Sequence, residues 1–270
     1  MAFDPALLSP GQRYLPGILG GLGPLSHVEF ERAILARGHR RGARRDRDHP
    51  VWLVASAAST PGRTGALLEG GASPLPHLTA FATLLERSGA DALFVVCNTA
   101  HAWHAEVQKA LRIPWVHLME LVAAAVRAAH PAGTRVGLLA TDGTLSAGLY
   151  QRALEARDLV PVAPEIGSEL QARVGAAIGD PATGIKATGD RVTREAREHL
   201  LAAARWCVQQ GARVVVPACT EVSVGLTGEV FADAPLTDPL GVAAEVLLDL
   251  AYGKCDPESL YFRRGVGGRV

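Results

Sequence analysis

Short apolar runs alternate with longer segments of helical periodicity along most of the chain. Apolar runs without polar alternation are typical of parallel strands buried on both faces, and they occur at 14–19, 51–56, 93–97, 136–140 and 214–219. The spacing of apolar residues predicts a short strand at 115–118 and helices from about residue 26 and over 75–88, 100–111, 120–129, 168–178, 190–210 and 240–252. This alternation predicts an α/β fold with parallel sheets and right-handed crossovers.

The strand–turn–helix pattern begins again near residue 134, where 137–144 mirrors the opening segment 17–23. Each half also carries a cysteine after a later strand. We therefore predict two similar small domains, each a parallel sheet flanked by helices, with the active site in the interdomain cleft. The final helix is expected to pack back on the first half. The predicted boundaries are 1–118 plus 226–270 for a discontinuous first domain and 119–225 for the second.

Two cysteines, Cys97 and Cys219, end apolar strand-like runs and are each followed within two residues by a threonine. Ligands of parallel sheets bind just beyond the carboxyl ends of the strands, so both thiols lie where chemistry is expected. Helix N-termini beside them are predicted to lower their pKa values. Two opposed thiols suit a reaction that takes a proton from one face of a carbon and returns one to the other. Cys207 and Cys255 are interpreted as ordinary small hydrophobic residues.

Composition limits the classes of partner. The chain has 270 residues, 48% of them hydrophobic, and a formal net charge of zero, which gives no electrostatic reason to expect nucleic acid or a membrane surface. The arginine-rich run at 37–47 is interrupted by Asp46 and followed by Asp48, and it is interpreted as a solvated helix end and loop. No CxxC pair, basic leader or span-length apolar segment is evident, so a cytoplasmic protein with reduced thiols is expected.

The sequence offers weak signals for a cofactor or a metal. The turn at 20–23 lacks the GxGxxG spacing, so we predict no nucleotide cofactor; the turn either admits a small anionic ligand or serves packing alone. His101 with His104, and His27 with Glu31, have ligand-compatible helical spacing but no evident third ligand, so no metal is predicted. His101 is equally compatible with a structural and a proton-handling role.

Two basic residues could bind a carboxylate. Arg63 is predicted in a loop soon after the second strand, where a guanidinium can form two hydrogen bonds to one carboxylate. Lys186 is predicted in a glycine-containing loop and not on a helix. Taken singly, either would more often be a surface charge.

Six segments together resemble the aspartate/glutamate racemase superfamily, and within it the aspartate racemases: 17–25, 45–50, 61–64, 97–101, 184–187 and 219–222. The resemblance runs from about residue 17 to 246. It implies interconversion of L- and D-aspartate by two bases, with Cys97 serving the D-enantiomer and Cys219 the L-enantiomer. It also implies a homodimer and no pyridoxal phosphate, and we expect no other cofactor. Without a cofactor to delocalise the carbanion, electrostatic stabilisation and exclusion of water must lower the barrier, so we expect domain closure over the amino-acid substrate.

The resemblance further implies the substrate contacts. Arg63 and Lys186 would bind the carboxylates and offset the charge of a carbanion-like transition state. Asn98, Thr99 and Thr220 would hold the α-amino and α-carboxylate groups. The full set of expected substrate-binding residues is Gly23, Arg63, Asn98, Thr99, Thr141, Lys186, Thr220 and Glu221.

Three positions depart from the family pattern. Ser26-His27 stands where Ala-Thr is common, Asp142 where threonine is usual, and Ala218 where glycine often precedes the second cysteine. His27 and Asp142 are predicted in loops facing the cleft and are possible specificity residues. Asp142 either points into the cleft or caps a helix beginning near residue 144. The alternatives are a racemase for glutamate or a modified amino acid, a decarboxylase or isomerase of the same superfamily, and a non-catalytic amino-acid-binding protein.

Overall fold

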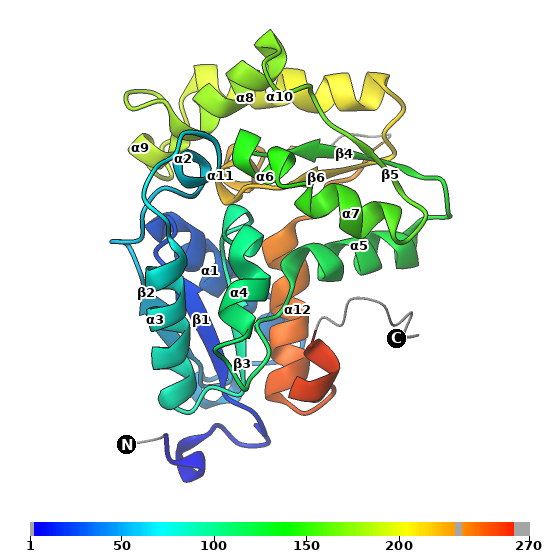
Figure 1. Cartoon of the computed structure of the whole chain (residues 1–270). Helices are drawn as coiled ribbons and strands as arrows, with labels where there is room; N and C mark the ends of the chain where they lie inside the picture. Colours follow the sequence, from blue (N-terminus) through cyan, green and yellow to red (C-terminus); the bar gives the residue numbers. More distant parts are fainter. Residues whose placement is uncertain (1–2, 230–233, 262–270) are drawn as a thin grey trace.

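Two three-stranded parallel sheets form the framework of the protein (Figure 1). The computed structural model describes residues 3–229 and 234–261; the parts of the predicted first domain at 1–2, 230–233 and 262–270 lie outside them. Both sheets have the same order, with the first strand of each half in the middle, which confirms the predicted α/β fold of two similar halves. The orders are β2 (Leu53–Ser56), β1 (Pro16–Gly20), β3 (Ala92–Val95) and β5 (Val160–Val162), β4 (Arg135–Leu139), β6 (Val214–Pro217).

Helices cover both sheets. In Figure 1, α8 and α10 lie on the outer side of the second sheet, whereas α12 runs along the first half beside α1. Among the described residues, no helix has both the length and the apolar character needed to cross a bilayer. The α-helices are α1 (Pro24–Arg40), α2 (Arg63–Leu68), α3 (Leu75–Arg87), α4 (His104–Gln108), α5 (Leu118–Ala129), α6 (Asp142–Ser146), α7 (Leu149–Glu155), α8 (Glu169–Gly179), α9 (Ile185–Thr188), α10 (Arg194–Gln209), α11 (Thr220–Gly225) and α12 (Pro239–Ala251).

Four local predictions were wrong. The predicted strand at 115–118 forms only a single bridge, between Trp115 and Leu93. The predicted helix at 100–111 divides into the 3-10 helix η3 (Thr99–Trp103) and α4. Arg63 and Lys186 lie on the short helices α2 and α9 and not in loops. Helices of four to six residues carry too few apolar positions to produce a recognisable period.

A continuous hydrophobic core joins the two halves. Its largest cluster includes Ile18 and Phe94 from the first sheet and Leu138 and Val216 from the second, connected by residues of α5, α7 and α12. Two smaller clusters contain residues of α3 in the first half and of α8 and α10 in the second. Burial across this shared core holds the two sheets in a defined relative position. The exact domain boundaries stay a prediction.

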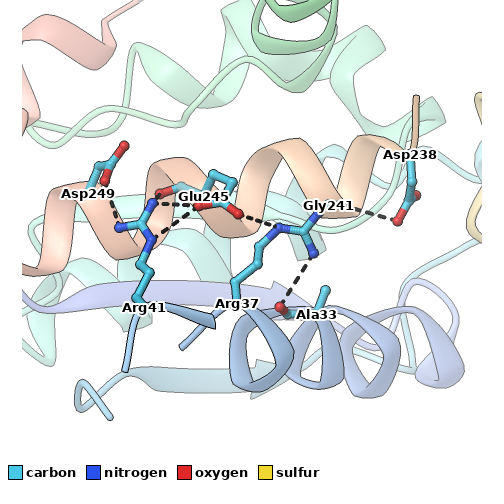
Figure 2. Close-up of polar contacts among 7 residues, drawn as sticks. All are labelled: Ala33, Arg37, Arg41, Asp238, Gly241, Glu245 and Asp249. Atoms are coloured by element: carbon cyan, nitrogen blue, oxygen red, sulfur yellow. Dashed lines mark hydrogen bonds and ion pairs between the residues drawn. The ribbon is translucent and has the colours of Figure 1, made fainter. Parts of the chain in front are cut away.

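An ion-pair network fastens α12 to α1 (Figure 2). Glu245 on α12 pairs with Arg37 at 3.0 Å and with Arg41 at 2.5 Å, and Arg41 also contacts Asp249 at 2.7 Å. Burial lowers the pKa of Arg37, and the Glu245 carboxylate opposes that effect. Gly241 permits the approach, because a Cβ there would overlap the Arg37 guanidinium.

Glu245→Gln is expected to destabilise the fold by about 1 kcal/mol, because it leaves a partly buried Arg37 without its charged partner. The free energy of unfolding from a urea titration measures the effect. Glu198→Gln is the matched control: it breaks an exposed pair with Arg194 within one helix and should change stability by less than about 0.5 kcal/mol. Equal effects of the two substitutions would contradict a special role for the network.

Candidate active site

The carboxyl ends of strands from both sheets meet at one small cavity. Its volume is about 140 Å³, and segments following β1, β2, β3, β4 and β6 all contribute to its lining. This is the end of a parallel sheet at which ligands bind. Nine residues singled out from the sequence line this cavity: Arg63, Cys97, Asn98, Thr99, Thr141, Lys186, Cys219, Thr220 and Glu221.

Three other predicted residues do not line the cavity. Gly23 is the N-cap residue of α1, beside Glu221. His27 lies on α1 and not in a loop facing the cleft, and its Nδ1 accepts a hydrogen bond from the Gly21 amide at 3.2 Å. Asp142 accepts a hydrogen bond from Gln171 at 2.7 Å.

Asp142 was expected either to point into the cleft or to cap a helix beginning near residue 144, and the structure places the cap one residue earlier. Thr141 is the N-cap of α6, and its hydroxyl accepts a hydrogen bond from the Thr144 amide at 3.2 Å. Asp142 is the first helical residue, where a carboxylate is favoured by the positive end of the backbone dipoles. The direction of its side chain toward Gln171 removes the reason to expect Asp142 beside a bound substrate.

The glycine turn after β1 packs tightly against the chain. Gly21 has a φ of +80°, and a Cβ there would overlap the backbone amide of Ala57 beyond β2. The Gly21 amide is already bonded to His27. These contacts give the turn a packing role, and the lining of the cavity begins one residue later, at Leu22.

The backbone carbonyl of Cys97 accepts a hydrogen bond from His101, and the two partners of the imidazole define its protonation state. Cys97 is 8% exposed and follows β3. His101 Nδ1 lies 2.9 Å from the Cys97 carbonyl and must donate to it, while His101 Nε2 lies 3.1 Å from the Trp115 indole N–H and must accept from it. Both ring nitrogens are therefore used by a neutral imidazole. Burial lowers the pKa of His101 to about 4, which favours the structural interpretation.

Cys219 is a protonated hydrogen-bond donor. It is 8% exposed, and its Sγ lies 2.9 Å from Oε2 of Glu221, which is itself 5% exposed. Burial and the neighbouring Glu221 carboxylate raise the pKa of the Cys219 thiol well above its usual value. The prediction that helix α11 would lower this pKa was therefore wrong. A helix of one and a half turns has a small dipole effect compared with desolvation and an adjacent negative charge.

Two cations border the cavity. The Arg63 guanidinium donates to the carbonyls of Thr60 at 3.3 Å, Pro61 at 3.1 Å and Leu22, so two of its five N–H groups are left for a ligand. The Lys186 residue as a whole is accessible to solvent at the cavity edge, whereas its ammonium lies among the groups of the cavity. Burial of its ammonium lowers the pKa, but the nearby groups of Cys219 and Glu221 outweigh that effect and the pKa of Lys186 is raised.

Hydroxyl and amide groups complete the cavity and connect the two halves. Thr99 Oγ1 lies 3.1 Å from Thr141 Oγ1 and 2.9 Å from Thr144 Oγ1. The Tyr150 hydroxyl donates to Asn98 Oδ1 at 2.7 Å. Sequence reasoning missed Tyr150, because a tyrosine inside a helical pattern reads as core. It also did not identify Ser26 and Thr64 as cavity residues, although Ser26 was noted as a departure from the family pattern and Thr64 belongs to the segment 61–64.

The part of the chain that the structure describes contains no cluster of side chains suited to bind a metal ion. Within residues 3–229 and 234–261, no group of three or more His, Cys, Asp or Glu side chains is arranged to hold an ion. His101 and His104 have parallel rings 6.3 Å apart, and the Nε2 of His104 lies 2.8 Å from the Trp115 carbonyl. The pair thus packs around Trp115.

A curated relative shares part of the sequence. The chain is 31% identical over 146 residues to the broad-specificity amino-acid racemase RacX of Bacillus subtilis (strain 168). The match covers 52% of this chain and 60% of that protein, so the chain spans less than two thirds of the relative's length.

Solved structures extend the similarity over nearly the whole chain. The Picrophilus torridus aspartate racemase is 25% identical, with a TM-score of 0.74 over 92% of this chain and 98% of that one. An aspartate racemase homologue from Pyrococcus horikoshii has the same fold at 21% identity, with a TM-score of 0.69 over 88% and 99% of the two chains. The sequence profile of the Asp/Glu/Hydantoin racemase family matches residues 19–247. With a match of that extent, this chain belongs to the Asp/Glu/Hydantoin racemase family.

Proposed function

We propose that this protein is a cofactor-independent amino-acid racemase that interconverts L- and D-aspartate. The observation that carries the proposal is the presence of two thiols, one from each half of the molecule, in the lining of one small cavity. A binding protein has no use for two such groups. Family membership and the similarity to an aspartate racemase support the same reaction class.

The proposed mechanism uses the thiols as acid and base on opposite faces of the α-carbon. For D-aspartate, Cys97 as thiolate takes the α-proton and the Cys219 thiol delivers a proton to the other face. For L-aspartate the roles reverse. The hydrogen bond from Cys219 Sγ to Glu221 suits Cys219 to the acid role, and the carboxylate is a proton acceptor when Cys219 must ionise.

Charge and size favour an acidic substrate. Arg63 and Lys186 supply two positive charges at the cavity, one for each carboxylate of an acidic amino acid. Aspartate and glutamate carry one net negative charge at neutral pH. A volume of about 140 Å³ lies well below the roughly 300–1,000 Å³ of drug-sized ligand pockets and favours the shorter of the two. The ammonium of Lys186 would stabilise the carbanion-like transition state.

Solvent deuterium exchange tests the proposal. Incubation with L-aspartate in D₂O, without added cofactor, is expected to give D-aspartate carrying deuterium at the α-carbon, measured by proton NMR and chiral chromatography. D-aspartate should give the L-enantiomer in the same way. A panel of glutamate, alanine and lysine measures specificity, and faster turnover of any of these would replace aspartate as the substrate. Complete retention of α-hydrogen across the panel would exclude racemisation of all four.

A further inference from the structure

Tyr150 links the second half of the molecule to a residue of the candidate active site. It lies on α7, 52 residues after Asn98, and its hydroxyl is 2.7 Å from Asn98 Oδ1. Tyr150 is 1% exposed and belongs to the core that joins the two sheets, whereas Asn98 is 5% exposed and lines the cavity. Tyr150 itself does not line the cavity.

The hydrogen bond determines which way the Asn98 amide faces. A tyrosine hydroxyl has one proton, and burial raises the pKa of Tyr150 well above its usual value, so that proton is retained. A buried O–H without an acceptor is costly. Asn98 Oδ1 is the acceptor that the structure provides. Turning the amide over would direct its NH₂ at the hydroxyl and leave the tyrosine proton without this acceptor.

The other side of the amide then faces the cavity. With the oxygen held by Tyr150, Asn98 offers N–H donors to a ligand, and N–H donors bind carboxylate oxygens but not an ammonium group. We propose that Tyr150 is a positioning residue for substrate recognition, which orients Asn98 so that its amide binds a substrate carboxylate. The inference rests on the proposed function in one respect: it takes the ligand to be an amino acid, whose carboxylate the Asn98 amide binds.

The arrangement also makes substrate binding depend on how the two halves meet. Asn98 follows β3 of the first sheet, and α7 packs against α5 and β5 in the second half. The hydroxyl bonds of Thr99 to Thr141 and Thr144 cross the same boundary. The orientation of the Asn98 donor is therefore set by an element outside the half that carries it.

A double-mutant cycle tests the inference. The variants are Tyr150→Phe, Asn98→Ala and their combination, and the readouts are KM and kcat for aspartate and the Kd of succinate, a dicarboxylate that cannot be racemised, by calorimetry. Tyr150→Phe should raise KM and the succinate Kd by roughly five- to tenfold and change kcat by less than about threefold. In the Asn98→Ala background, adding Tyr150→Phe should change neither constant further.

A second tyrosine supplies the control, and several results would overturn the proposed role of Tyr150. Tyr252→Phe removes a hydroxyl hydrogen bond to the Asp48 carbonyl, outside the cavity lining, and should leave both constants unchanged. Additive effects of Tyr150→Phe and Asn98→Ala, or a fall in kcat alone, would overturn the proposal. Should Tyr150→Phe not fold, Asn98→Asp keeps Tyr150 intact and presents an acceptor to the ligand; succinate binding equal to wild type would then overturn it. Succinate binding without any racemisation would instead count against the proposed function.

Discussion

Serine in place of either Cys97 or Cys219 is expected to lower racemisation of aspartate by at least about a thousandfold in both directions. Each turnover needs one thiol to take a proton and the other to deliver one, so loss of either group stops the cycle. A hydroxyl is a far weaker acid than a thiol and is not ionised near neutral pH. Initial rates with each enantiomer, measured by circular dichroism or chiral chromatography, check the prediction.

Two other cysteines supply the controls. Cys255 is partly exposed, and Cys207 is buried in the core of the second half with a pKa raised by burial to about 12. Neither lines the cavity. Cys255→Ser and Cys207→Ser should therefore leave kcat largely intact, although the latter places a hydroxyl in an apolar cluster and should lower stability. Near-normal activity in Cys97→Ser or Cys219→Ser would mean that another group carries the proton on that face.

Glu221→Gln is expected to lower kcat/KM by about ten- to a hundredfold, because the carboxylate that accepts the Cys219 proton loses its charge. The substitution should also move the pH dependence. Glu221 helps to raise the pKa of Cys219, so its neutralisation lowers that pKa. Consumption of D-aspartate, which needs the Cys219 thiol, should then decline at lower pH than in wild type. Consumption of L-aspartate, which needs the thiolate, should rise at lower pH.

Initial rates measured across pH with each enantiomer separate the decline of D-aspartate consumption from the rise of L-aspartate consumption. Glu120→Gln is a suitable control, since Glu120 is a partly buried carboxylate paired with Arg157 outside the cavity lining. That variant should keep the wild-type pH profile. If either pH dependence moved to higher pH in Glu221→Gln, Glu221 could not be the group that raises the pKa of the Cys219 thiol.

Much of the fold could be read from the sequence because parallel strands have a strong signature. The runs ending near Gly20 and Cys97, and those near Leu139 and Cys219, lie in strands buried on both faces and lack any polar alternation. Strand β5 (Val160–Val162) was not predicted, since three residues at the edge of a sheet give no recognisable pattern. The short helices that carry Arg63 and Lys186 were missed for a similar reason.

The candidate site could be predicted only in part. Nine residues singled out from motifs lie together at the cavity. All strands of a parallel sheet end at the same edge, so residues that follow different strands lie close together there. His27 and Asp142 were selected because they depart from a family pattern. Such a departure does not tell in which direction the side chain points. The structure turns His27 toward Gly21 and Asp142 toward Gln171.

By itself, the sequence determined the α/β class, the repeat of two halves and the placement of Cys97 and Cys219 at strand ends, because these follow from local periodicity and chain order. Only the tertiary structure decided the state of the groups around them. The raised pKa of Cys219 depends above all on burial, which also strengthens the effect of the adjacent Glu221 carboxylate. The neutral tautomer of His101 and the orientation of Asn98 by Tyr150 each depend on burial and on a partner distant in the sequence. Desolvation and hydrogen bonding act through distance in space, and distance along the chain does not reveal them.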